Sequence, residues 1–336
     1  MRPSVRFLAA TVLLAGSLAA QQNVLYVGNP VAGTGGGNAF PWGSNGIRYQ
    51  TIVPSMQLPP VLVINDIFVA GAPSGTDLDI DYTDIEILIG RTAQVAPVAD
   101  WNTNNPNPVR VYRGPLRVYF ERAAWRGLGL PNAHVFVPTP AEPNMCLEII
   151  VWGTTTGTGN FYFPETDTGV NRAFRFQWTT NQTQTPLTSG GGSKFGLLLQ
   201  DGNFVEVGGG CPGSNGTPRI GASTYPIGGQ TMDLTLSGAR PASPAFLSIG
   251  ASFTSFGTIP LPLDLGVLGA PSCFVWNDSI VTLQTSTNAT GNASITLPIP
   301  VGTAFTRLYA TWFNVDIPAN SFGLTTSSGG KLLLSN

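Results

Sequence analysis

The chain has 336 residues, of which 42% are hydrophobic and only 10% are charged. This composition excludes an intrinsically disordered protein, because disordered segments contain few apolar residues and carry a high net charge. The formal net charge is −2 and no cluster of basic residues occurs, so nucleic acid is not an expected partner.

The first twenty residues have the features of a secretory signal. Arg2 and Arg6 precede the apolar stretch 7–16, and small residues follow at 17, 19 and 20. A charged start, an apolar middle and a small-residue cleavage site occur in the order typical of such signals. The apolar stretch is shorter than the roughly 20 residues that a membrane-spanning helix needs. We therefore predict that residues 1–20 are a signal peptide and that the protein is secreted or on the cell surface, with no membrane span after cleavage. The alternative is a buried N-terminal helix.

Short apolar segments bounded by Gly, Pro, Asn and Asp follow over residues 22–208, and none shows a sustained helical period. Gly114-Pro115 is expected to form a turn between two strands. Phe174, Phe176 and Trp178 alternate with polar residues and are expected on one inner face. The predicted strands are 62–69, 84–89, 109–113, 116–120, 134–137, 147–152 and 174–178. We predict a jelly-roll-like β-sandwich for this domain.

The glycine run 208–210 is predicted to be a linker to a second domain, because glycine-rich segments are flexible and few contacts cross a domain boundary. A chain of this length also exceeds the usual size of a single core. Residues 211–336 then contain further short strands, predicted at 231–236, 245–250, 281–284, 293–297 and 308–313. Short strands at this density predict a compact immunoglobulin-like sandwich. The fold class is therefore mainly β with two sandwich domains.

The three cysteines of an exported chain meet oxidising conditions, so we expect a disulfide. Cys211 and Cys273 each lie in a turn-like segment rich in Gly, Pro and Ser, whereas Cys146 lies inside an apolar run. We therefore pair Cys211 with Cys273 and expect Cys146 to be a buried thiol. Zinc is a poor alternative, because no Cys-x-x-Cys pair occurs and the chain has a single histidine.

Several ordered motifs of the last 125 residues or so resemble a C-terminal module of secreted proteins from planctomycete-type bacteria. The segments 82–91 and 111–116 are similar to the β-rich region that precedes this module. The motifs of the module itself are 210–218, 261–266, 269–273 and 297–300. The resemblance implies export, a β-sandwich and a Cys211–Cys273 bridge. It implies no activity and no catalytic residues.

The sharpest polar pattern is Asp77-Leu78-Asp79-Ile80-Asp81. Alternation places the three carboxylates on one face of a strand or loop, where they would repel one another. Calcium prefers several oxygen ligands and would relieve this repulsion, so Asp77, Asp79 and Asp81 are candidate calcium ligands. The alternative is a solvated acidic strand edge that discourages aggregation. No cofactor other than calcium is expected.

Trp42 and Trp101 are the candidate ligand-binding residues among the seven tryptophans. Both lie in polar segments that are predicted to be loops, and an exposed indole can stack on the apolar face of a sugar ring. The alternative for all seven is packing in the core, since large aromatic side chains are highly buried on average.

Catalysis has weak support in the sequence. His134 is the only imidazole, and it adjoins an apolar strand without a nucleophile motif. Glycoside hydrolysis needs two carboxyl groups facing one cleft, and the sequence cannot select a pair. The candidate carboxylates are Asp84, Glu86, Glu121, Glu142, Glu148 and Glu165.

These observations lead to a functional expectation. We expect a secreted or cell-surface, non-enzymatic protein that serves adhesion, matrix formation or glycan binding. Its partner would be a polysaccharide or a cell-envelope component. The alternatives are a secreted carbohydrate-active hydrolase that uses paired carboxylates and a purely structural envelope component.

Overall fold

The computed structural model describes residues 24–335, apart from 39–40, 44, 60, 75, 155–163, 180–183, 200–201 and 304–305. The predicted signal peptide, residues 1–20, lies outside the described residues. The prediction of a mainly β protein is confirmed. The helical elements found in the described part are the single-turn helix α1 (Trp101–Asn104) and the 3-10 turns η1 (Ser55–Gln57) and η2 (Leu265–Leu268). In the described ranges, no helix has the length and apolarity needed to cross a membrane.

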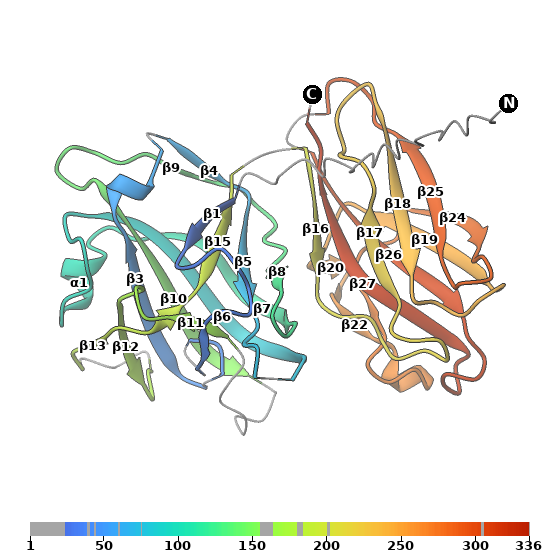
Figure 1. The fold of residues 1–336 in the computed structure, drawn as a ribbon, viewed down its shortest axis with the longest axis horizontal. Coiled ribbons are helices and arrows are strands. Elements are labelled where there is room, and N and C mark those ends of the chain that lie inside the picture. The colour runs from blue at the N-terminus through green and yellow to red at the C-terminus, as the bar shows by residue number, and fades with distance from the viewer. Residues whose placement is uncertain are drawn as a thin grey trace, which may run out of the picture.

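A six-stranded antiparallel sheet dominates the N-terminal half (Figure 1). Its strands in spatial order are β13 (Leu187–Ser189), β12 (Arg172–Phe176), β3 (Ile47–Val53), β10 (Asn144–Thr154), β6 (Leu78–Thr92) and β7 (Val109–Phe120). Ile85, Ile87 and Ile89 alternate along β6 toward the core, so Glu86 and Leu88 lie on the opposite, outer face. This outer face carries the candidate site described below.

The predicted turn at Gly114-Pro115 is wrong, because β7 runs through both residues as one strand. The strand pairs with β6 on one side and forms the edge of the sheet on the other. Proline has no N–H to donate, and an edge strand tolerates it because one side of the strand needs no ladder bonds. The register also shifts here, between the pairs formed by Tyr82 and Ile85.

A second, nine-stranded sheet extends through both halves of the chain. In spatial order it contains β1 (Val24–Val27), β15 (Phe195–Leu198), β5 (Asp66–Ala70), β8 (Trp125–Gly127), β16 (Asn203–Val207), β27 (Leu324–Leu333), β26 (Arg307–Val315), β19 (Pro244–Gly250) and β24 (Val281–Ser286). The N-terminal half, residues 24–199, and the C-terminal half, residues 202–335, meet at a parallel bridge between Val207 of β16 and Gly127 of β8. The halves therefore share one sheet.

Smaller sheets complete the fold. A three-stranded sheet, β17 (Arg219–Ala222), β18 (Thr231–Ser237) and β25 (Ala293–Pro298), belongs to the C-terminal half. The short pairings are β14 (Gly192–Ser193) with β11 (Glu165–Asp167) and β2 (Gly36–Gly37), β4 (Leu62–Ile64) with β9 (His134–Phe136), β20 (Ser255–Phe256) with β21 (Ile259–Pro260), and β22 (Leu263–Asp264) with β23 (Phe274–Val275).

Two large hydrophobic clusters lie between these layers. The first contains residues of the six-stranded sheet, such as Ile87, and of β5 and β15, such as Ile67 and Phe195, so these sheets face each other. It continues into the C-terminal half through Trp276. The second cluster packs β17 and β18 against the C-terminal strands of the nine-stranded sheet, with Trp312 among its buried side chains. Each half thus has a core, and the first core extends across the junction.

Gly208, Gly209 and Gly210 do not form the contact-poor linker that the sequence predicts. Gly208 and Gly209 are buried. A Cβ atom on Gly208 would lie 2.0 Å from Cη2 of Trp276, and Gly208 has a φ of +61°. Only glycine combines this backbone conformation with such a close ring contact. The glycines therefore form a packed junction, while the domain boundary itself stays a prediction.

The packed junction makes Gly208→Ala a costly substitution. Gly257 is a matched control, because its φ is +60° but no atom lies within 4 Å of the position that a Cβ would occupy there. Gly257→Ala should lower the free energy of unfolding by about 1–2 kcal/mol, the cost of a left-handed alanine. Gly208→Ala should lower it by a further 1–3 kcal/mol or so through overpacking against Trp276. Urea unfolding of both variants measures the difference. Equal losses would restore the flexible-linker interpretation.

Candidate functional site

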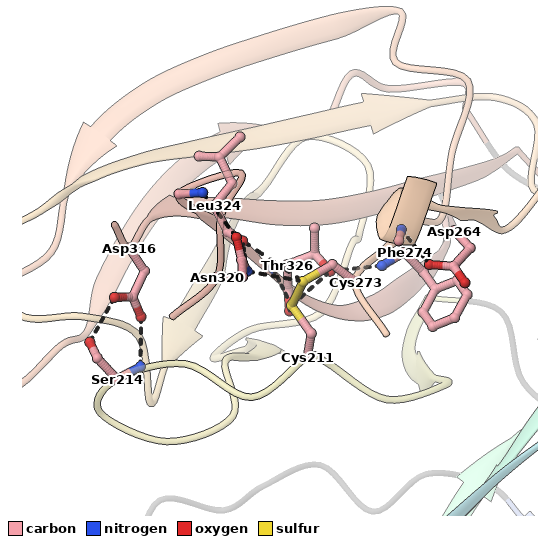
Figure 2. Close-up of a disulfide and its surroundings, with 11 residues drawn as sticks. Cys211, Ser214, Asp264, Cys273, Phe274, Asp316, Asn320, Leu324 and Thr326 are labelled. Carbon is pink, nitrogen blue, oxygen red and sulfur yellow. Dashed lines mark hydrogen bonds between the residues drawn. A yellow bond between two sulfur atoms is a disulfide. The ribbon is translucent and has the colours of Figure 1, made fainter. Parts of the chain in front are cut away.

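The predicted disulfide is confirmed. Cys211 and Cys273 are bonded and buried, and Cys146 is a buried free thiol. Figure 2 shows the bridge beside Thr326 of β27, whose backbone N–H donates to Sγ of Cys211 over 3.1 Å. The Thr326 hydroxyl accepts from the N–H of Phe274. The bridge therefore fastens the segments around residues 211 and 273 to the last strand, as a structural element.

The three predicted calcium ligands contact donors of the protein itself. Asp79 and Asp81 pair with Arg117 at 3.0 and 2.8 Å, and Asp77 accepts from the backbone N–H of Arg122 at 2.8 Å. Arg117 lies directly opposite Asp81 on β7, so its guanidinium relieves the repulsion that calcium was expected to relieve. Among the described residues no cluster of three or more His, Cys, Asp or Glu is arranged to hold a metal ion.

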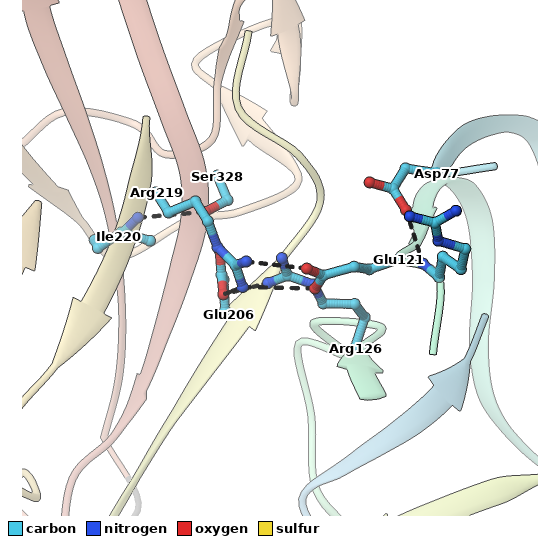
Figure 3. Close-up of polar contacts among 8 residues, drawn as sticks. Asp77, Glu121, Arg126, Glu206, Arg219, Ile220 and Ser328 are labelled. Carbon is cyan, nitrogen blue, oxygen red and sulfur yellow. Dashed lines mark hydrogen bonds and ion pairs between the residues drawn. The ribbon is translucent and has the colours of Figure 1, made fainter. Parts of the chain in front are cut away.

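These aspartates instead lie near the junction of the two halves. The guanidinium of Arg117 stacks on the ring of Phe274, 3.5 Å from its centroid. A ring of four charges lies nearby, in which both arginines contact both glutamates (Figure 3). Its members are Glu121 and Arg126 from the N-terminal half and Glu206 and Arg219 from the C-terminal half. The acidic pattern is therefore part of an interface within the chain.

Trp42 is not an exposed platform, and the prediction that it binds a ligand through an exposed ring is wrong. Its exposed fraction is 0%, and it packs against Tyr82, Phe120 and Phe195. Its carbonyl accepts from the hydroxyl of Tyr82 over 2.7 Å. The loop that carries Trp42 places the indole into the first core, where large aromatic side chains contribute most to packing.

Trp101 begins α1 on the outer face of the six-stranded sheet. Asp100 caps the helix by accepting from the N–H of Thr103. The indole N–H of Trp101 donates to the carbonyl of Gln184 over 2.8 Å, and the exposed fraction of the residue is 7%. Its ring is therefore held in one orientation, with little of it open to solvent.

Arg48 and Trp178 pack against the ring of Trp101. The two indoles meet edge to face, with their centroids 5.3 Å apart. The guanidinium of Arg48 lies 4.6 Å from the Trp101 ring and 5.0 Å from the Trp178 ring. The sequence predicts Trp178 on the inner face, but Gln177 has a left-handed φ of +54° that ends the alternation. Trp178 consequently joins the outer cluster with Trp101.

These side chains line a cleft of about 300 Å³. Its lining residues are Arg48, Asp100, Trp101, Asn102, Trp178, Gln184, Thr185 and Pro186. The amide, hydroxyl and carboxylate groups can exchange hydrogen bonds with a ligand, and the indoles and the proline ring provide apolar contact. A small, roughly ring-sized polar ligand fits this combination of chemistry and volume.

The buried carboxylate of Glu148 holds the cleft residue Arg48 in place. Glu148 accepts from the Nε of Arg48 and from the side-chain amides of Gln50, at 2.9 Å, and Asn105, at 2.8 Å. The amide of Gln50 also reaches the carbonyl of Trp101. Both oxygens of this buried carboxylate are occupied by these donors, so Glu148 anchors Arg48.

The other candidate carboxylates also contact cations. Glu86 and Asp84 pair with Arg113, Glu142 pairs with Arg91, and Glu165 pairs with Lys194. Glu121 belongs to the charge ring. His134 lies on β9 opposite Ile64, and burial lowers its pKa and thus favours the neutral imidazole. The geometry therefore selects none of them as a catalytic acid.

Of the residues singled out in the sequence for ligand binding, only Trp101 lies at the cleft. Arg48, Gln184 and Thr185 were missed, because no local pattern marks them. The contacts Trp101–Gln184 and Arg48–Glu148 join positions 83 and 100 residues apart. The cation–π geometry at Arg48 is equally invisible without the strand register.

Comparisons with known proteins add little to this picture. No protein-family model and no curated protein matches the chain. Among solved structures, the chain is similar to the T=3 Penaeus vannamei nodavirus structure at 11% identity, over 99% of this chain and 96% of that chain. The TM-score is 0.13, so nothing is transferred from it.

Proposed function

We propose that this chain is a secreted or cell-surface, non-enzymatic protein that binds saccharides through the Trp101 cleft. The observation that carries the proposal is the cleft itself, which combines ordered indoles with hydrogen-bonding side chains at its rim. A saccharide offers hydroxyl groups for the polar side chains at the rim and apolar C–H groups for the small part of the indoles that is open to the cleft. Adhesion or matrix formation on a polysaccharide or a cell-envelope component follows from such binding.

Export and architecture are parts of the same proposal. The signal-like residues 1–20 and the Cys211–Cys273 bridge support export, because disulfides persist in oxidising compartments. The resemblance of the C-terminal motifs to secreted planctomycete-type modules points the same way. Two domains, a jelly-roll-like sandwich over 22–208 and an immunoglobulin-like sandwich over 211–336, are part of the proposal, and the second hydrophobic cluster, whose residues all come from the C-terminal half, supports it.

Rim variants test the cleft without disturbing the core. Asn102 and Thr185 are exposed residues at its rim. A glycan array with the wild-type protein identifies saccharides that bind. The double variant Asn102→Ala, Thr185→Ala should then bind the best of them about 30-fold more weakly, since each lost hydrogen bond contributes about 1 kcal/mol. Isothermal titration calorimetry measures the affinities.

The matched control is Asn107→Ala, Thr258→Ala, which removes the same groups from exposed positions that do not line the cleft. It should bind like the wild type. If no saccharide on the array binds, or if the rim variant and the control bind equally well, the cleft is not a saccharide site.

A further inference from the structure

The outer face of the six-stranded sheet continues beyond the cleft. Ile150 of β10 pairs with Arg48 of β3 on one side and with Glu86 of β6 on the other. Directly opposed residues of an antiparallel pair share a face, so Glu86 lies on the face that carries the cleft. Neighbouring strands are about 4.8 Å apart, which places Glu86 two strand spacings, or roughly 10 Å, from the row of Arg48.

The ion pairs on this face are layered. Glu86 is 6% exposed, whereas its partners Arg110 and Arg113 are 57% and 40% exposed. Glu148 and Arg48 repeat the arrangement, at 1% and 17%. The carboxylates therefore lie against the sheet and the guanidinium groups lie above them, toward solvent. Asp84, at 36%, is the more exposed carboxylate here, and it contacts Arg113.

Of the two arginines that pair with Glu86, Arg110 has more hydrogen-bond donors open to a ligand than Arg113. Its Nε donates to Glu86 over 2.6 Å. Among the described residues no hydrogen bond is found for its two terminal nitrogens, so their N–H groups face solvent. The planar guanidinium fork matches the oxygens of a carboxylate or a sulfate.

Trp152 supplies an aromatic surface between the arginines and the cleft. It lies at a β-bulge of β10, between the register pairs of Val151 and Gly153, and a bulge changes the direction of a side chain. Its indole N–H donates to Glu86 over 3.1 Å, and the guanidinium of Arg113 lies 5.4 Å from its ring. Trp152 also packs against the hydrophobic cluster that contains Trp101. Trp152 and the two indoles of the cleft thus belong to one hydrophobic cluster on this face of the sheet.

We propose that this face binds an anionic polysaccharide, with an acidic sugar unit at the solvent-facing guanidinium of Arg110, beside the charge of Arg113, and a neighbouring unit in the Trp101 cleft. The inference rests on the proposed saccharide-binding function and adds the class of ligand. The separation of the two subsites requires a chain of sugars and not a single ring. The acid group is a carboxylate or a sulfate, because both present the oxygen pair that a guanidinium fork recognises.

Single arginine variants test the acidic subsite. Arg110→Gln and Arg113→Gln are made separately, so that Glu86 keeps one guanidinium and the indole of Trp152. Each should weaken binding of polygalacturonate or dextran sulfate about fivefold at about 150 mM salt. Binding of neutral saccharides in the cleft should stay within twofold or so of the wild type. Arg91→Gln is the control, because Arg91 is 43% exposed on the same sheet and pairs with Glu142 instead.

The outcomes separate the two proposals. A preference for polygalacturonate over dextran sulfate identifies the carboxylate as the acid group, and the reverse identifies the sulfate. Binding of neutral saccharides alone overturns the acidic subsite and leaves the cleft proposal standing. Unchanged binding of acidic polymers by both arginine variants also overturns the subsite. Equal binding of a thymidine oligonucleotide would show that the face recognises polyanions in general, which overturns the assignment to a saccharide. Absence of binding to every saccharide overturns both proposals.

Discussion

Replacing Lys331 with methionine is expected to lower the free energy of unfolding by about 3–5 kcal/mol, the cost of leaving a buried charge without its partner. Lys331 and Asp66 both have exposed fractions of 0%, and their charged atoms are 3.2 Å apart. The ammonium also donates to the carbonyls of Asn65 and Leu130. Methionine keeps the apolar stem of the side chain but removes all three interactions and the charge. Guanidinium chloride unfolding measures the loss.

A double variant separates the charge from the packing. In Asp66→Asn, Lys331→Met both charges are absent, so the penalty for an unpaired buried carboxylate disappears. The amide oxygen introduced at position 66 can still accept from the backbone N–H groups of Ile67 and Leu130, which both donate to Oδ1 of Asp66, whereas the N–H of Gly129 donates to Oδ2 and loses its acceptor. The double variant should therefore be more stable than Lys331→Met alone, by at least about 1 kcal/mol. Additive losses would mean that Lys331 contributes through packing and not through the ion pair.

The ion pair between Asp66 and Lys331 also couples the two halves of the chain. Asp66 belongs to β5 and Lys331 to β27, and the charge ring of Figure 3 joins the halves at a second place. A shared sheet, a shared hydrophobic cluster and ion pairs across the junction all favour unfolding of the two halves together. Lys331→Met should consequently shift the transition of both halves, even if each is a separate domain by topology.

The features that sequence analysis predicted correctly depend on local patterns. Alternation and turn residues predict strands, because a strand exposes its two faces to different surroundings within a few residues. The disulfide was found for a similar reason: turn-like segments around Cys211 and Cys273 contrast with the apolar run around Cys146. The buried environment of Cys146 is visible in the residues next to it.

The errors share one physical cause, which is a partner from a distant part of the chain. The sequence around Asp79 and Asp81 suggests a cation site, because it does not show that Arg117 lies beside them on the neighbouring strand. The sequence around Gly208 suggests a flexible segment, because it does not show that the ring of Trp276 packs against this glycine. The polar segment around Trp42 suggests an exposed ring, because it does not show the packing of that ring against Phe120 and Phe195. Each case requires the strand register or the contact between sheets, neither of which is encoded within a short window of sequence.

The residues that shape the cleft could not be predicted from the sequence for the same reason. Trp101 was selected for its loop position, but what shapes the site is the packing of the Arg48 guanidinium against both indoles. Arg48 is fixed by Glu148, and Glu148 by Gln50 and Asn105. These residues come from β3, β10 and the loop after α1. A charge network of this kind exists only once the sheet has formed.

Removal of the disulfide is the second substitution with a large expected effect. The bridge closes a loop of 62 residues, for which the chain-entropy model gives a stabilisation of about 4 kcal/mol through the unfolded state. Cys211→Ala, Cys273→Ala should lose about this amount in denaturant unfolding under oxidising conditions. The wild-type protein should approach the stability of this variant when dithiothreitol reduces it, and the variant itself should not respond to dithiothreitol.

Cys146 provides the control for this experiment. Burial raises the pKa of its thiol well above the ordinary value, so little reactive thiolate is available to exchange with the bridge. Cys146→Ala should therefore keep the full response to dithiothreitol, with only the smaller loss expected from a shortened buried side chain. Peptide mapping without reduction should recover Cys211 joined to Cys273 in the wild type and in Cys146→Ala alike. A wild-type protein that is equally stable with and without dithiothreitol would show that the bridge does not restrict the unfolded chain, and that the packing around Thr326 alone holds these segments together.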